Sequence, residues 1–173
     1  MQKWFMLTVV GEDRPGIVAK LTQALYEGGA NLGEASMVRL GGNFTIMLMV
    51  ALDGSARDLD RLIEPVTESL GLHCHIDAIR GRLHEHRWPD VRITVFGADR
   101  AGIVARVTGA LLEAGLNILD LESSVAGSAE QPVYVMQIEG SAAEGIEALR
   151  SALAAVAEQG IDTAIEPIET MVG

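Results

Sequence analysis

The sequence predicts an α+β fold built from two tandem copies of one βαββαβ module. The first observation is a repeat: a shift of 86 residues aligns residues 9–32 with 95–118, and 14 of those 24 positions are identical. The second is periodicity, because apolar residues alternate along some segments and recur every three or four residues along others. Two copies of this length indicate a duplicated domain, since solenoids need three or more short repeats.

The first half of each copy reads as a strand followed by a helix. In the first copy, residues 4–10 are rich in β-forming side chains and stop at Gly11. Asp13 and Pro15 then favour the start of a helix. The expected helix carries apolar residues at helical spacing and ends at a glycine pair: Ile17, Val18, Leu21, Leu25, Gly28 and Gly29.

The second half of the copy reads as a hairpin, a helix and a last strand. Residues 32–40 and 44–52 are expected strands, joined by Gly41-Gly42-Asn43, which tolerates the positive φ of a tight turn. An apolar stripe over 59–70 predicts the second helix, and 72–79 the last strand.

The second copy repeats this order with segments of matching character. The resulting order is the ferredoxin-like arrangement, a four-stranded antiparallel sheet with both helices on one face. The expected elements are 91–96, 101–114, 117–125, 133–139, 142–158 and 161–168. We therefore predict domains at 1–80 and 90–173, with 81–89 as a linker.

Apolar side chains are predicted on both sides of some strands of the first copy. Met37 and residues 46–49 place them on the helix side and on the uncovered side of the sheet. A sheet face without helices that is still apolar suggests packing against another module. Pairing between the two copies or between chains is therefore expected, and we predict a homodimer.

Composition favours a globular cytoplasmic protein. The net charge is −11, with −3 in residues 1–86 and −8 in 87–173, which argues against direct binding of nucleic acid. The arginines near the linker (Arg80, Arg82, Arg87 and Arg92) are interpreted as a solvated segment. Cys74 is the only cysteine, so no intrachain disulfide forms. No apolar run approaches the roughly 20 residues of a membrane span, and the start does not read as a signal peptide.

The motif around the first strand resembles the ACT family, and its tandem glycine cleavage repressor group in particular. The resemblance rests on Gly11-Glu12-Asp13-Arg14-Pro15-Gly16-Ile17-Val18, on Asn31-Leu32, and on Leu40-Gly41-Gly42-Asn43-Phe44-Thr45. It implies allosteric amino-acid sensing, with the ligand between paired modules at the loop after the first strand. It also implies a protein partner, a DNA-binding activator of the LysR type, and glycine or serine as the first ligands to consider.

The ligand-binding candidates cluster at the start of the first helix of each copy. Unpaired N–H groups there receive a carboxylate, and the helix dipole favours it. In the first copy Asp13 would accept from an ammonium group and Asn31 would both donate and accept; the plain alternative is that Asp13 caps the helix and Asn31 is a turn residue. The candidates are Gly11, Asp13, Arg14, Pro15, Gly16, Ile17 and Asn31, then Asp99, Gly102, Ile103 and Asn117.

The second copy departs from the motif, and other functions remain open beside sensing. Ala98 and Ala101 stand where Glu12 and Pro15 stand in the first copy, which weakens the second candidate. No phosphate loop, nucleophile pattern or metal-ligand spacing appears, so we expect no cofactor, no metal and no enzymatic activity.

The alternative to a sensing repressor is a regulatory subunit that gives feedback control to a metabolic enzyme. The first module also resembles the leading module of formyltetrahydrofolate deformylases, but the repeat occupies both halves and leaves no segment for their catalytic domain.

Overall fold

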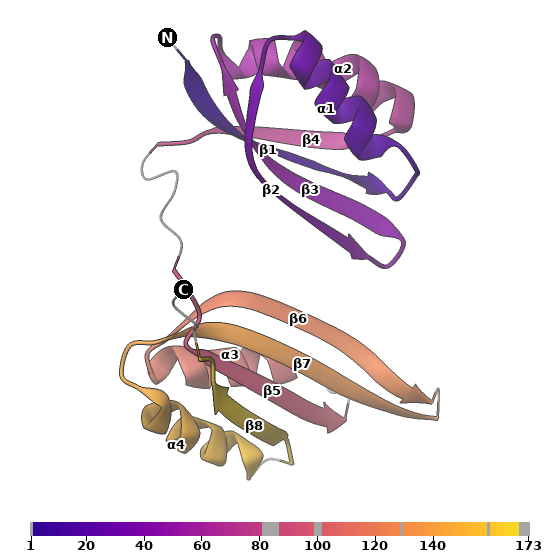
Figure 1. Ribbon diagram of the computed structural model, residues 1–173. Helices are drawn as coiled ribbons and strands as arrows, with labels where there is room; N and C mark the ends of the chain where they lie inside the picture. Colours follow the sequence, from indigo (N-terminus) through magenta and orange to yellow (C-terminus); the bar gives the residue numbers. More distant parts are fainter. Residues whose placement is uncertain (1, 81–86, 99–101, 129, 159, 170–173) are drawn as a thin grey trace. The chain divides into compact units, whose positions relative to one another are not determined.

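The computed structural model describes residues 2–80, 87–98, 102–128, 130–158 and 160–169. It divides the chain into two compact units, Met1–His84 and Glu85–Gly173, and each has the order βαββαβ (Figure 1). The predicted fold class is therefore confirmed. Most of the predicted linker, residues 81–86, lies outside the described residues.

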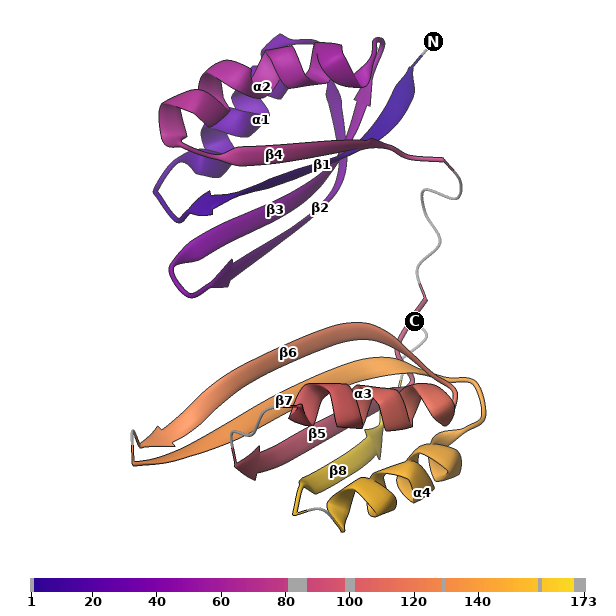
Figure 2. The ribbon, with the colours of Figure 1, turned by 180° about the vertical axis from the view of Figure 1, so that it is seen from behind.

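The first unit is a four-stranded antiparallel sheet in the order β2-β3-β1-β4. Both helices cover one face of this sheet, as the two opposite views show (Figures 1 and 2). Its elements are β1 Lys3–Glu12, α1 Ile17–Glu27, β2 Asn31–Leu40, β3 Asn43–Leu52, α2 Ala56–Leu70 and β4 His73–Ala78.

The core of the first unit follows from the two periodicities. Alternate residues of β1 are buried, and so are the residues of α1 that share one helical face. The buried set in these two elements is Phe5, Leu7, Val9, Ile17, Leu21 and Leu25. Since this sheet face and this helix stripe are both apolar, they pack together in one core cluster.

Helix α2 begins three residues before the stripe that predicted it, because Ser55 supplies a cap. The Ser55 hydroxyl accepts from the Asp58 N–H at 3.3 Å, and the Ser55 N–H donates to Asp58 Oδ2 at 2.8 Å. This reciprocal pair is a capping box. The donated bonds from Ser55 hold the pKa of Asp58 below its ordinary value. The helix ends at Gly71, where φ is 64°, as the sequence indicated.

The second unit repeats the fold in the order β6-β7-β5-β8. Its elements are β5 Val91–Ala98, α3 Ile103–Glu113, β6 Leu116–Ser128, β7 Gln131–Ala142, α4 Ile146–Ala157 and β8 Asp162–Pro167. The expected helix start at residue 142 is wrong. Leu116 pairs with Ala142 across β6 and β7, so this residue completes the sheet, and the helix begins only after Gly145.

The helix-free faces of the two sheets differ in character. In the first unit Met6 and Met49 lie directly opposite each other on that face, next to Met47, so this part of the face is apolar, while Asp77 lies on the other side of Met6. In the second unit the equivalent face carries Arg92, which pairs with Glu139 at 2.8 Å and with Glu166 at 3.4 Å. The apolar side chains expected on both sides of the strands are thus found in the first sheet.

Candidate functional site

The start of α1 is an uncapped helix terminus. Gly16 occupies the N-cap position with φ 87°, and no side chain in the described part of the chain caps the helix. The first intrahelical bond runs from the Lys20 N–H to the Gly16 carbonyl at 3.0 Å. The N–H groups of the first helical turn therefore have no intrahelical acceptor and point out of the helix end. The alternative that Asp13 caps this helix is wrong.

The backbone conformation at position 16 requires a glycine. A Cβ placed there has no atom of the described residues within 4 Å, so the cost of a side chain lies in the positive φ and not in a clash. Gly16→Ala is expected to lower the free energy of unfolding by about 1 to 2 kcal/mol. Urea unfolding measures this change. Gly109→Ala is the matched control: Gly109 lies within α3 and also has open space, so this variant is expected to be neutral or slightly stabilising. Equal losses in both variants would contradict the conformational argument.

Asp13 ties the loop between β1 and α1 to the turn between β2 and β3. Its N–H donates to the Gly42 carbonyl at 3.0 Å. Its carboxylate Oδ2 accepts from Arg39 Nη2 at 2.6 Å. The Asp13 carboxylate, expected to meet a ligand ammonium group, already has a cationic partner within the chain.

Arg39 is a residue that the sequence analysis missed. It stands beside Phe44 in the β2–β3 register, two residues from the glycine turn, at the end of the sheet where β1 also finishes. The signal was present in the sequence, because a hairpin turn after residue 40 brings residue 39 back to the exit of the first strand. Without the register, however, several charged residues were equally plausible partners for Asp13.

The other predicted residues of this loop have distinct structural positions. Gly11 allows close packing, because a Cβ there would lie 2.6 Å from Leu72 Cδ2. Arg14 is exposed and donates to Glu12 at 2.7 Å, which lowers the pKa of the Glu12 carboxyl. Pro15 is exposed in the turn before the helix. The Ile17 side chain is buried in the core, so only its backbone N–H is available to a ligand.

Asn31 lies at the opposite end of the sheet from this loop. It pairs with Ala51, which pairs in turn with Trp4 near the start of β1, whereas Asp13 follows the end of β1. Nine residues of strand separate Trp4 from Asp13, which corresponds to about 30 Å at 3.3 Å per residue. A single module therefore does not bring Asn31 to the candidate loop.

The second copy repeats part of this geometry. Gly102 is the N-cap of α3 with φ 84°, again without a side-chain cap among the described residues, and the Ile103 side chain is buried. Asn117 is exposed near the start of β6. Asp99 lies outside the described residues, so the structure does not describe the loop before α3 in full.

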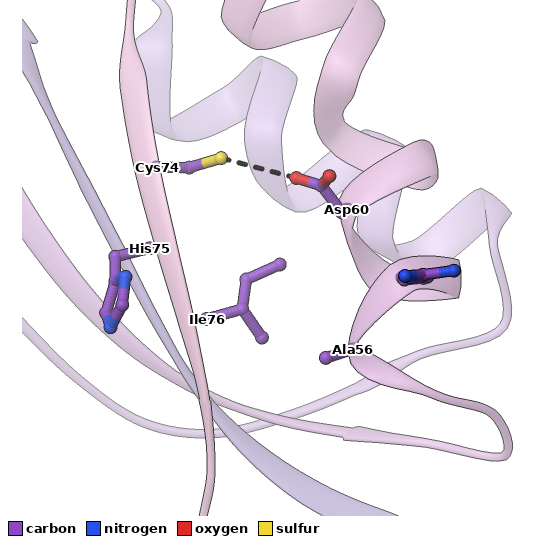
Figure 3. Close-up of a pocket in the computed structure, with 6 residues that line it drawn as sticks. Ala56, Asp60, Cys74, His75 and Ile76 are labelled. Atoms are coloured by element: carbon purple, nitrogen blue, oxygen red, sulfur yellow. Dashed lines mark hydrogen bonds between the residues drawn. The ribbon is translucent and has the colours of Figure 1, made fainter.

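A separate hollow of about 240 Å³ lies between α2 and β4 (Figure 3). Cys74 Sγ lies 3.5 Å from Asp60 Oδ1 inside it, while His75 projects from the other side of the strand. Burial, and then the neighbouring Asp60 carboxylate, raise the pKa of the Cys74 thiol. A raised pKa favours the protonated thiol, which is the less nucleophilic form.

The raised pKa of Cys74 predicts slow alkylation. At pH 8 iodoacetamide is expected to modify folded protein several-fold more slowly than the same chain in urea. Asp60→Asn removes a group that raises the pKa and is expected to increase the rate in the folded state, whereas Asp77→Asn, on the other face of the sheet, leaves it unchanged. Mass spectrometry follows the modification. Equal rates for the wild type and Asp60→Asn would contradict the assignment.

The described residues contain neither a helix that could span a membrane nor a cluster that could hold a metal ion. None of the helices among the described residues is long and apolar enough to cross a membrane. No group of three or more His, Cys, Asp or Glu side chains converges in a way that could hold a metal ion in the described ranges. Of the four histidines in the sequence, His84 and His86 lie outside those ranges, whereas His73 and His75 lie in β4.

Comparison with known proteins gives a consistent result over most of the chain. The sequence model of the ACT domain matches residues 3–77 and 90–166, which are the two copies of the repeat. The UPF0237 protein YjhC of Lactococcus lactis is 35% identical over 85 residues, covering 46% of this chain and 95% of that protein.

Two relatives extend over both modules. The glycine cleavage system transcriptional repressor of Escherichia coli is 28% identical over 126 residues, covering 70% of this chain and 65% of that protein. The alignment thus spans slightly less than two thirds of the repressor. The crystal structure of an unknown protein from Galdieria sulphuraria matches with a TM-score of 0.80 and 26% identity, covering 98% of this chain and all of that one.

Proposed function

Since the chain belongs to the ACT domain family, we propose that it is an amino-acid-sensing regulatory protein that acts through a protein partner. The observation that carries this proposal is the uncapped start of α1 at Gly16, held against the β2–β3 turn by Asp13. Its similarity to the Escherichia coli glycine cleavage repressor supports glycine as the first ligand to consider.

The helix start suits a small carboxylate ligand. Free N–H groups and the positive end of the helix dipole both favour an anion at this point. None of the described residues occupies the space where a Gly16 Cβ would lie, so a ligand can reach the backbone closely. Glycine has about five non-hydrogen atoms, and a ceiling of roughly −1.5 kcal/mol per atom limits its affinity to the low-micromolar range. A sensor of this kind responds to micromolar or millimolar glycine.

A second copy of the chain would complete the site with Asn31. β2 is an edge strand, and all its residues are exposed. If the β2 strands of two copies pair antiparallel about their midpoint, Asn31 of one copy lies beside Leu40 of the other. Leu40 precedes the turn that holds Asp13, so Asn31 then lies near the loop of the other copy. This arrangement makes the homodimer part of the binding site.

The net charge and the similarity to the repressor support the proposed protein partner. A net charge of −11 disfavours direct contact with DNA, so control of transcription would pass through a DNA-binding protein, with a LysR-type activator as the first candidate. We propose a cytoplasmic location, which fits the single cysteine. The catalytic step of any regulated pathway then belongs to other proteins.

A ligand screen by thermal shift tests the sensing function. Each of the twenty amino acids is added at millimolar concentration, and a ligand that binds only the folded state raises the melting temperature with concentration. We expect glycine or serine to give the largest shift, confirmed by calorimetry, and light scattering to give about twice the 18.4 kDa chain mass. No shift with any amino acid would contradict sensing, and a monomer at tens of micromolar would contradict the shared site.

A further inference from the structure

Three charged residues before α1 and one near the end of β2 are matched in two ion pairs. Arg14 pairs with Glu12 at 2.7 Å, and Arg39 pairs with Asp13 at 2.6 Å. The Glu12–Arg14 pair is exposed on both sides, whereas the Asp13 side chain is only 25% exposed. The Asp13–Arg39 pair is thus the one with the less exposed carboxylate, and it joins the segment before α1 to β2, which are distant in sequence.

These ion pairs belong to the first module alone. In the strand register Arg39 lies beside Phe44, and the matching position of the second sheet, beside Tyr134, holds Val125. Tyr134 matches Phe44 because each lies opposite the glycine near the end of its central strand, Gly97 and Gly11. Ala98 stands in the position of Glu12. Each of the two pairs therefore lacks one member in the second copy, although the fold is repeated.

The charge on Asp13 affects which ligands bind at this loop. An unpaired Asp13 carboxylate next to the helix start would repel the carboxylate of an incoming amino acid and would attract simple amines. With Arg39 in place the loop has no net charge, and the dipole of α1 is free to favour the ligand carboxylate. The same guanidinium also limits the binding of a ligand that carries only a positive charge.

We infer that Arg39 is the specificity-determining residue of the first module, which makes the loop select zwitterionic α-amino acids over amines of the same shape. This inference rests on the proposed amino-acid site and concerns how that site discriminates. Arg39 acts through Asp13 and the local field, so it is a positioning residue. Its side chain is 68% exposed, so the ion pair contributes little to stability and its removal leaves the module folded.

Calorimetry with glycine and glycinamide separates an electrostatic role from a structural one. Glycinamide keeps the ammonium group and lacks the carboxylate. In Arg39→Gln we expect glycine to bind at least about fivefold more weakly, while glycinamide binds as well as before or better, so the ratio of the two affinities falls. Serine and serinamide form a second pair if serine gives the larger thermal shift.

Two further variants sharpen the test. Arg57→Gln removes an equal charge from an exposed residue at the start of α2 and should leave the ratio unchanged. Asp13→Asn combined with Arg39→Gln makes the pair neutral again and should recover part of the glycine preference.

The outcomes distinguish this inference from the function on which it rests. If both ligands weaken by the same factor in Arg39→Gln, or if glycine binds unchanged, Arg39 does not set specificity while the sensing function stands. Failure of the double variant to recover any preference would also contradict the inference. If the unmodified chain binds neither glycine nor serine, the proposed function itself fails and the inference falls with it.

Discussion

Leu25→Ala is expected to destabilise the first module by about 2 to 5 kcal/mol and to leave the second module folded. Leu25 is fully buried in α1, and shortening it leaves a cavity among the residues that α1 packs against. The core clusters of the described residues each draw on one unit only, from Phe5 to Ile76 and from Val91 to Ile165. A cavity in one core is therefore expected to leave the stability of the other core unchanged.

Leu111→Ala is the matched variant, because Leu111 occupies the same repeat position in α3 and is equally buried. Each variant should lower the midpoint temperature of a different unfolding transition, which calorimetry measures. If the first module carries the ligand site, glycine raises the midpoint temperature of the transition that Leu25→Ala affects. It leaves the midpoint temperature of the transition that Leu111→Ala affects unchanged. A single transition lowered equally by both variants would show that the modules unfold together.

The fold could be predicted because its signals are local and occur twice. The strand and helix periods of residues 4–25 are unambiguous, and the repeat supports the same interpretation in 91–114. The start of α4 was the least determined point. Residues 141–145 contain small and acidic side chains that suit a helix, and only the pairing of Ala142 with Leu116 assigns this residue to the sheet. Such pairing depends on contacts between distant segments.

The candidate site was predictable only in part, for the same reason. Gly16 was proposed because it stands at the expected start of the first helix, and the structure places it at the N-cap of α1 with a φ of 87°. Arg39 was missed because its role depends on where the hairpin folds back. Asn31 was grouped with the loop by sequence motif, while the sheet places it about nine strand residues away. Sequence motifs identify residues without locating them.

Asn31→Ala is expected to weaken amino-acid binding by about 1 to 3 kcal/mol, because a buried ligand group would lose its hydrogen-bonding partner. Asn117→Ala, at the same position of the second repeat, should have a smaller effect. Isothermal titration of the two variants measures the difference. Loss of affinity in Asn117→Ala with none in Asn31→Ala would move the site to the second module.

The distance between Asn31 and the loop makes a stronger test possible. If Asn31 serves the loop of a second copy, each dimer site takes its loop from one chain and its asparagine from the other. Asn31→Ala chains and Gly16→Ala chains should then each bind weakly alone. A mixed dimer of the two carries both defects in one site and neither in the other. Mixing should therefore restore tight binding, with a stoichiometry of one ligand per mixed dimer, as titration after co-refolding would show. Native mass spectrometry would verify that mixed dimers have formed. If they form without recovery of binding, each site does not combine the loop of one chain with Asn31 of the other, and the antiparallel pairing of β2 edges is wrong.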